Sequence, residues 1–148
     1  MDRKFIVELI ALLFTFLFVY AGVAKLLDVE KFRMQIGQSP ILTEMAWFAA
    51  WFIPCTEIVI SIFLVIRRFQ LVGLFAAFGL MVMFTAYIIS ILQFSEHIPC
   101  ACGRILQNLG WTGHLIFNVA SILLAITGIV FHTRDQNKNE DQLLTNNV

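Results

Sequence analysis

Long apolar runs alternate with short polar segments along this chain. The apolar runs cover about residues 5–25, 45–66, 71–94 and 111–131. Twenty helical residues rise about 30 Å, which is the thickness of the hydrocarbon core of a bilayer. The pattern therefore predicts an all-α fold, an integral membrane bundle of four transmembrane helices.

The first run has a competing interpretation as a secretory signal peptide. Asp2, Arg3 and Lys4 precede it, and Gly22-Val23-Ala24 resembles a small-residue cleavage site. A signal peptide usually has an apolar region of about 7–15 residues. Because the run here is longer, we expect a retained span.

The connector after the first span carries an amphipathic pattern. Val29, Phe32 and Ile36 fall at i, i+3 and i+7, which is one face of a helix. Asp28 is a suitable N-cap, and Gly37 is a suitable stop. We expect a short interfacial helix that lies on the membrane. An ordinary loop is the alternative.

The composition supports the membrane assignment and separates a membrane domain from a polar tail. Of the 148 residues, 59% are hydrophobic and 14% are charged; soluble domains carry about 25% charged residues. The formal net charge is zero, which gives no indication of nucleic-acid binding. Residues 1–132 are predicted to form the membrane domain, and the polar residues 133–148 a disordered cytoplasmic tail.

The distribution of basic residues predicts the topology. With four spans both termini share a side, and six of the ten basic residues fall on it: Arg3, Lys4, Arg67, Arg68, Arg134 and Lys138. The positive-inside rule then predicts cytoplasmic termini in a bacterial inner membrane. Trp47, Trp51 and Trp111 fall at the opposite, periplasmic boundary, as an aromatic belt would.

Two cysteines lie one residue apart in the predicted periplasmic loop between the third and fourth spans. Cys100 and Cys102 can form a tight, easily reduced disulfide. They can also bind a thiophilic metal such as copper or zinc, with His97 and His114 as possible further ligands. They can instead be inert residues beside the turn made by Pro99 and Gly103. Thiol–disulfide chemistry is favoured, because two close thiols are hard to keep reduced in an oxidising compartment.

An ionisable residue lies near the centre of the second span. A carboxyl group there costs about 2.5 kcal/mol or more, so Glu57 is a candidate functional residue. It could relay protons, hydrogen-bond a quinone or substrate, or form an ion pair; a protonated carboxyl bonded to another helix is the alternative. Pro54 leaves the carbonyl of Ala50 without its helical donor. Lys25 could reach Glu57 only with most of its length.

Three further polar residues lie within the spans. Cys55 is more typical of a small buried hydrophobe than of a redox thiol. Asn118 can hydrogen-bond between helices. His114, one turn nearer the surface, could assist a thiolate or be a polar interfacial residue.

Three motifs, in order, resemble a known family. Residues 21–28, Ala-Gly-Val-Ala-Lys-Leu-Leu-Asp, followed by Phe32, resemble the A-G-x-x-K-L-x-D…F signature of DoxX-like membrane proteins. Pro54 and Glu57 resemble the P-x-x-E of the MauE branch, the methylamine-utilisation proteins. Residues 99–103 resemble its C-x-C-G loop. The resemblance covers about residues 5–130.

This resemblance implies a redox-associated four-helix membrane protein, in a family whose founding member is associated with methylamine dehydrogenase maturation. Cys100 and Cys102 would be the redox pair, with Glu57 and Lys25 as polar partners. Quinone is a candidate cofactor, and a thioredoxin-like protein or an exported client a candidate partner. The expected role is that of an accessory thiol–disulfide oxidoreductase. A non-catalytic assembly or docking protein and a metal-handling protein are the alternatives.

Overall fold

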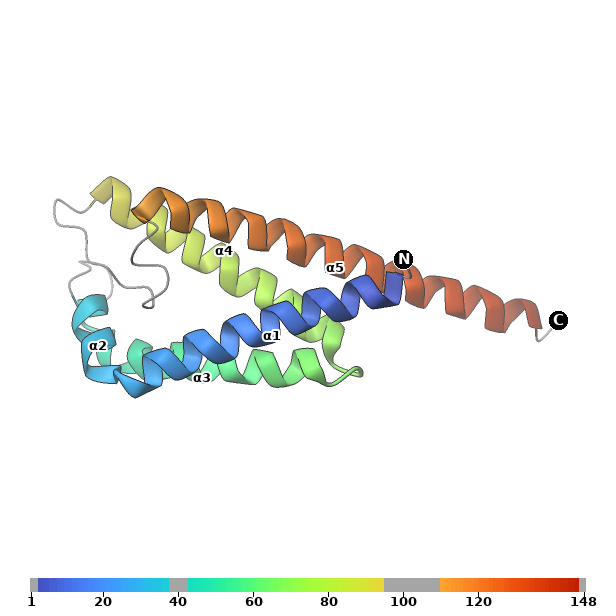
Figure 1. Ribbon diagram of the computed structural model, residues 1–148, viewed down its shortest axis with the longest axis horizontal. Helices are drawn as coiled ribbons and strands as arrows, with labels where there is room; N and C mark the ends of the chain where they lie inside the picture. Colours follow the sequence, from blue (N-terminus) through green and yellow to red (C-terminus); the bar gives the residue numbers. More distant parts are fainter. Residues whose placement is uncertain (1–2, 38–42, 95–109, 147–148) are drawn as a thin grey trace.

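The computed structural model describes residues 3–37, 43–94 and 110–146, and this part of the chain is entirely helical apart from its short turns (Figure 1). Its helices are α1 (Arg3–Leu27), α2 (Val29–Gly37), α3 (Ala46–Val65), α4 (Gln70–Phe94) and α5 (Gly110–Asn146). Four of them, α1, α3, α4 and α5, are long and apolar enough to cross a membrane. The predicted all-α, four-span architecture with a short helix after the first span is confirmed.

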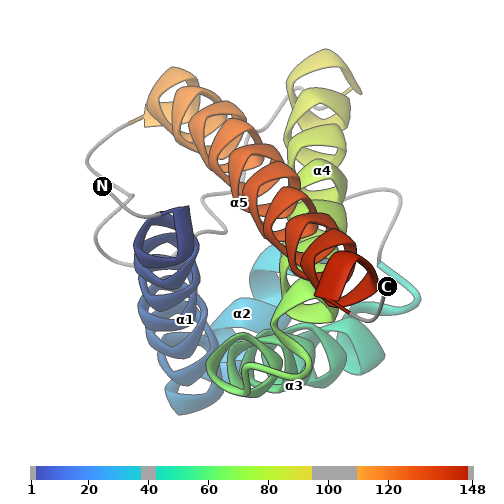
Figure 2. The ribbon, with the colours of Figure 1, turned by 90° about the vertical axis from the view of Figure 1, so that its right-hand side faces the viewer.

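The long helices form a bundle in which each packs against two neighbours. α1 packs against α3 and α5, and α4 packs against the same two helices (Figure 2). The end of α1, all of α2 and the start of α3 lie at one end of the bundle, together with the end of α4 and the start of α5 (Figure 1). We call this the α2 end. The start of α1 and the α3–α4 turn lie at the opposite end.

The interior of the bundle is filled by apolar side chains from all four long helices. Its fully buried members include Phe14, Phe18, Leu64, Leu74 and Ala125. Many large apolar side chains instead point outward, among them Leu12, Phe16, Val65, Ile116 and Leu123. An outer surface this apolar would be unusual for a monomer in water, and it suits contact with lipid.

Two glycines let neighbouring helices approach closely. A Cβ on Gly73 of α4 would lie 2.9 Å from the backbone nitrogen of Leu64 in α3. A Cβ on Gly128 of α5 would lie 3.3 Å from side-chain atoms of Ile10 and Leu74. Small residues at these crossings bring backbones together, and close packing is a main source of helix association in lipid.

Ion pairs tie the helices at the end opposite α2. Arg67, in the α3–α4 turn, lies 2.6 Å from the carboxylate of Glu8 in α1. Lys4 of α1 lies 3.8 Å from the carboxylate of Asp135 in α5. These charges fall on the side for which the sequence predicts cytoplasmic exposure.

The apolar face predicted for α2 is confirmed, but its packing partner is protein. Phe32 and Ile36 are buried in a cluster with Ala46, Ala49 and Ala50 of α3. The first turn begins at Asp28, whose carbonyl accepts a hydrogen bond from the amide of Phe32 at 3.0 Å. α2 therefore covers the start of α3, and its placement on the membrane surface stays a prediction.

The polar segment after the last span continues α5, and its assignment as a cytoplasmic tail beyond the membrane domain stays a prediction. α5 continues as helix to Asn146, which gives it 37 residues and a length of about 56 Å. Extending an existing helix avoids the cost of nucleation, and residues 133–146 contain neither Pro nor Gly. The pair between Lys4 and Asp135 also holds the first turn of this extension.

Candidate functional site

The charged side chains of Lys25 and Glu57 meet between α1 and α3. The ammonium of Lys25 donates a hydrogen bond to Oε1 of Glu57 and forms an ion pair with it. The Lys25 side chain is 12% exposed and that of Glu57 is 1% exposed. The sequence left several roles possible for Glu57, among them a proton relay, a hydrogen bond to a quinone or substrate, and an ion pair. The structure shows the ion pair.

Gly22 and Pro54 let the two helices come close enough for this contact. A Cβ on Gly22 would lie 3.2 Å from the carbonyl oxygen of Pro54 and 3.2 Å from Cγ1 of Ile58. Gly22 is three residues before Lys25, and Pro54 is three residues before Glu57. The A-G-x-x-K and P-x-x-E motifs, 32 residues apart along the chain, therefore form one site.

Two aromatic rings face the ammonium of Lys25. Its Nζ lies 5.6 Å from the ring centroid of Phe32 in α2 and 5.2 Å from that of Phe84 in α4. Ring faces attract cations, and the attraction strengthens where water is excluded. Lys25, Phe32, Glu57 and Phe84 come from four different helices, so the site joins α1, α2, α3 and α4.

The second carboxylate oxygen of Glu57 is available for chemistry. Oε2 is buried and has no hydrogen-bond partner within the described part of the chain. The nearby Ser61 hydroxyl donates to the backbone carbonyl of Glu57 at 2.8 Å rather than to its side chain. Because an unpaired buried acceptor is costly, Oε2 is suited to accept a proton or a hydrogen bond from a ligand.

The polar residues of α5 lie on a different helix from this pair. Asn118 is buried, and His114 is half-buried one turn nearer the α2 end. Ser121 donates to the carbonyl of Phe117 at 2.9 Å. An interhelical hydrogen bond for Asn118 and a catalytic role for His114 stay predictions.

The cysteines fall into two groups. Cys55 is a free thiol exposed on the outer surface of α3, not buried as a small hydrophobe would be. Cys100 and Cys102 lie outside the described residues, as does His97, so the redox pair and the metal alternative stay predictions. Among the described residues, no group of three or more His, Cys, Asp or Glu side chains is arranged to hold a metal ion.

Sequence reasoning missed the aromatic part of the site. The spacing of Phe32 predicts a place on the buried face of α2 and gives no indication of a contact with Lys25. Phe84 is one of fifteen phenylalanines, and nothing in its local sequence distinguishes it. Only the approach of α4 to the end of α1 reveals its role.

These features define a class: a four-span helical membrane protein with a Lys–Glu pair enclosed where α1, α2, α3 and α4 meet. The chain belongs to the MauE family, since residues 3–131 match the family described as Methylamine utilisation protein MauE. This match confirms the resemblance inferred from the three motifs. Searches of curated proteins and of solved structures returned no significant match.

Proposed function

We propose that this MauE-family protein assists thiol–disulfide chemistry in the maturation of exported proteins, with Cys100 and Cys102 as the exchanging pair. One observation carries the proposal. The two helix ends that flank the cysteine segment, Phe94 of α4 and Gly110 of α5, lie at the α2 end of the bundle (Figure 1). The Lys25–Glu57 pair links α1 to α3 toward the same end, and Lys25 also contacts the ring of Phe32 in α2.

The proposed reaction is a dithiol–disulfide exchange. A thiolate of an exported client attacks the Cys100–Cys102 disulfide and forms a mixed disulfide. A second client thiolate then breaks the mixed disulfide, which leaves the client oxidised and Cys100 and Cys102 as thiols. Two electrons have moved from client to protein, and a disulfide of a thioredoxin-like partner accepts them by the reverse exchange.

The need for an external partner follows from the cysteine count. The chain has three cysteines, and the third, Cys55, is exposed on the outer surface of α3. A second cysteine pair to pass electrons inward is therefore lacking. This favours an accessory oxidoreductase over an enzyme that completes the electron transfer by itself.

Quinone is the alternative electron acceptor for the same function. Oε2 of Glu57 is buried without a partner in the described residues, so it can accept a hydrogen bond from a quinol hydroxyl. In that version Glu57 also passes a proton to the quinone as the quinone is reduced to the quinol. The bacterial inner membrane, with both termini cytoplasmic, is the location that both versions require.

The test combines thiol labelling in intact cells with variants of the pair. A membrane-impermeant maleimide should label Cys100 and Cys102 only after reduction, and Cys100→Ser with Cys102→Ser should abolish disulfide formation in the client. Cys55→Ser is the control and should retain full activity.

Full client oxidation by the double variant would contradict the redox proposal and favour a docking or assembly role. Copper or zinc that co-purifies with the wild type but not with the double variant would favour metal handling through Cys100, Cys102 and His97.

A further inference from the structure

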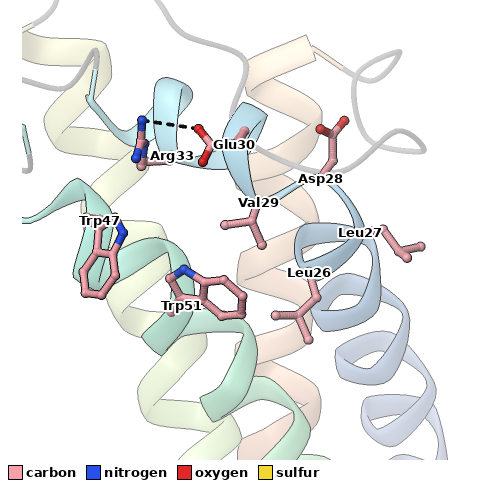
Figure 3. Close-up of a pocket in the computed structure, with 8 residues that line it drawn as sticks. All are labelled: Leu26, Leu27, Asp28, Val29, Glu30, Arg33, Trp47 and Trp51. Carbon is pink, nitrogen blue, oxygen red and sulfur yellow. Dashed lines mark ion pairs between the residues drawn. The ribbon is translucent and has the colours of Figure 1, made fainter.

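An open pocket of about 810 Å³ lies at the corner between the end of α1, the start of α2 and the start of α3 (Figure 3). Neither Lys25 nor Glu57 is among its lining residues. Its lining residues are Leu26, Leu27, Asp28, Val29, Glu30, Arg33, Trp47 and Trp51.

The pocket is layered, with a polar edge above an apolar wall. The Arg33 guanidinium lies 3.3 Å from the Glu30 carboxylate, and both side chains are exposed. Figure 3 shows the indoles of Trp47 and Trp51 below this ion pair, with Leu26 and Val29 across from Trp51. This order of charged groups, indoles and aliphatic groups matches the profile of a membrane–water interface.

The surroundings of the pocket indicate a lipid as its occupant. It lies where two helices able to span a membrane end and begin, which is the membrane–water boundary when these helices cross the bilayer. Trp47 and Trp51 are 65% and 49% exposed, one helical turn apart. Beside them on α3 the exposed rings of Phe48 and Phe52 stack with centroids 5.2 Å apart and continue an apolar surface for acyl chains.

We propose that this pocket is a specific site for the headgroup of phosphatidylethanolamine. The Arg33 guanidinium is suited to the phosphate. The ammonium fits the carboxylate of Glu30 and the faces of the two indoles below it. The edge holds two carboxylates and one guanidinium, a net charge of −1, which disfavours a headgroup that is itself anionic.

The test is native mass spectrometry of the purified full chain with an equal mixture of phosphatidylethanolamine and phosphatidylglycerol. The wild type should retain phosphatidylethanolamine about threefold or more over phosphatidylglycerol, because a half-exposed ion pair gives discrimination of this order. Asp28→Asn with Glu30→Gln leaves Arg33 as the one charged group among the lining residues and should invert the preference. Glu44→Gln removes an acid near the start of α3 but outside the lining, and should keep the wild-type preference.

A second measurement uses the tryptophans directly. In a Trp111→Phe background, brominated phosphatidylethanolamine should quench the fluorescence of Trp47 and Trp51 more than brominated phosphatidylglycerol does. Equal retention and equal quenching by the two lipids would overturn the proposal and assign the pocket to another partner, such as an exported polypeptide. A double variant with the wild-type preference would overturn it as well.

Discussion

Lys25 and Glu57 show how much of a functional residue's role depends on its partner. Sequence reasoning selects Glu57 because an ionisable group in a span is costly, and it names Lys25 as a partner at the limit of its reach. The ion pair forms because Gly22 lets α1 contact the carbonyl of Pro54. The rings of Phe32 and Phe84 then enclose the ammonium. Neither contact was predictable, since Phe32 reaches Lys25 only through the turn between α1 and α2, and Phe84 lies on α4.

Removing either charge of this pair should destabilise the protein by different amounts. Lys25→Met leaves the carboxyl of Glu57 buried without a cation and should lower the free energy of unfolding by about 3 kcal/mol. Glu57→Gln should lower the free energy of unfolding by only about 1 kcal/mol. The loss is smaller because Lys25, at the end of α1, can then extend its ammonium to the membrane interface. Titration with SDS in mixed micelles, followed by circular dichroism, measures both values.

The exposed Arg33–Glu30 pair provides a matched control. Glu30→Gln should change the free energy of unfolding by less than about 0.5 kcal/mol, because exposed pairs contribute little. The variant that carries both Lys25→Met and Glu57→Gln should be more stable than Lys25→Met alone. A double variant whose cost equals the sum of the two single costs would show that the charges do not interact.

At the scale of helices, glycine position determines where elements can cross. Gly73 and Gly128 lie where helices touch, as does Gly22, whereas a Cβ added to Gly79 would meet nothing within 4 Å among the described residues. All four lie in apolar runs and look alike in sequence. The helices themselves were predictable because hydropathy is local, and the face of α2 was predictable because its polar and apolar residues alternate with helical period.

Alanine substitutions should distinguish glycines at helix crossings from glycines in open positions by their effect on stability. Gly73→Ala and Gly22→Ala should each lower the free energy of unfolding by about 1–3 kcal/mol, because the new methyl group meets the backbone of α3. Gly79→Ala should be neutral or slightly stabilising, because the position is open and alanine favours helix. The same SDS titration gives the comparison, and equal losses at all three positions would contradict these crossings.

At the scale of the whole molecule, the two ends of the bundle differ in character. The end opposite α2 carries the pairs Arg67–Glu8 and Lys4–Asp135, and α5 extends beyond it as a polar helix (Figure 1). The α2 end carries the pocket with Trp47 and Trp51. The orientation with the α2 end in the periplasm stays a prediction, which rests on the basic-residue count.

Cysteine labelling in intact cells tests that orientation. In a chain whose three native cysteines are replaced by serine, Glu44→Cys should react with a membrane-impermeant maleimide added outside. Arg68→Cys, in the α3–α4 turn, should react only after the membrane is permeabilised. Both positions are exposed, so access and not burial determines the result. The reverse pattern would place the α2 end in the cytoplasm.

The sequence by itself determined the four spans, the amphipathic face of α2 and the family motifs, because each depends on residues close together in the chain. Tertiary structure alone decided which helices are neighbours, that Lys25 pairs with Glu57, and that a pocket forms beside Trp47 and Trp51. The physical reason is that a helix in lipid is apolar on its outer face as well as its inner one. Hydrophobic periodicity therefore cannot show which face packs, and only the assembled bundle reveals it.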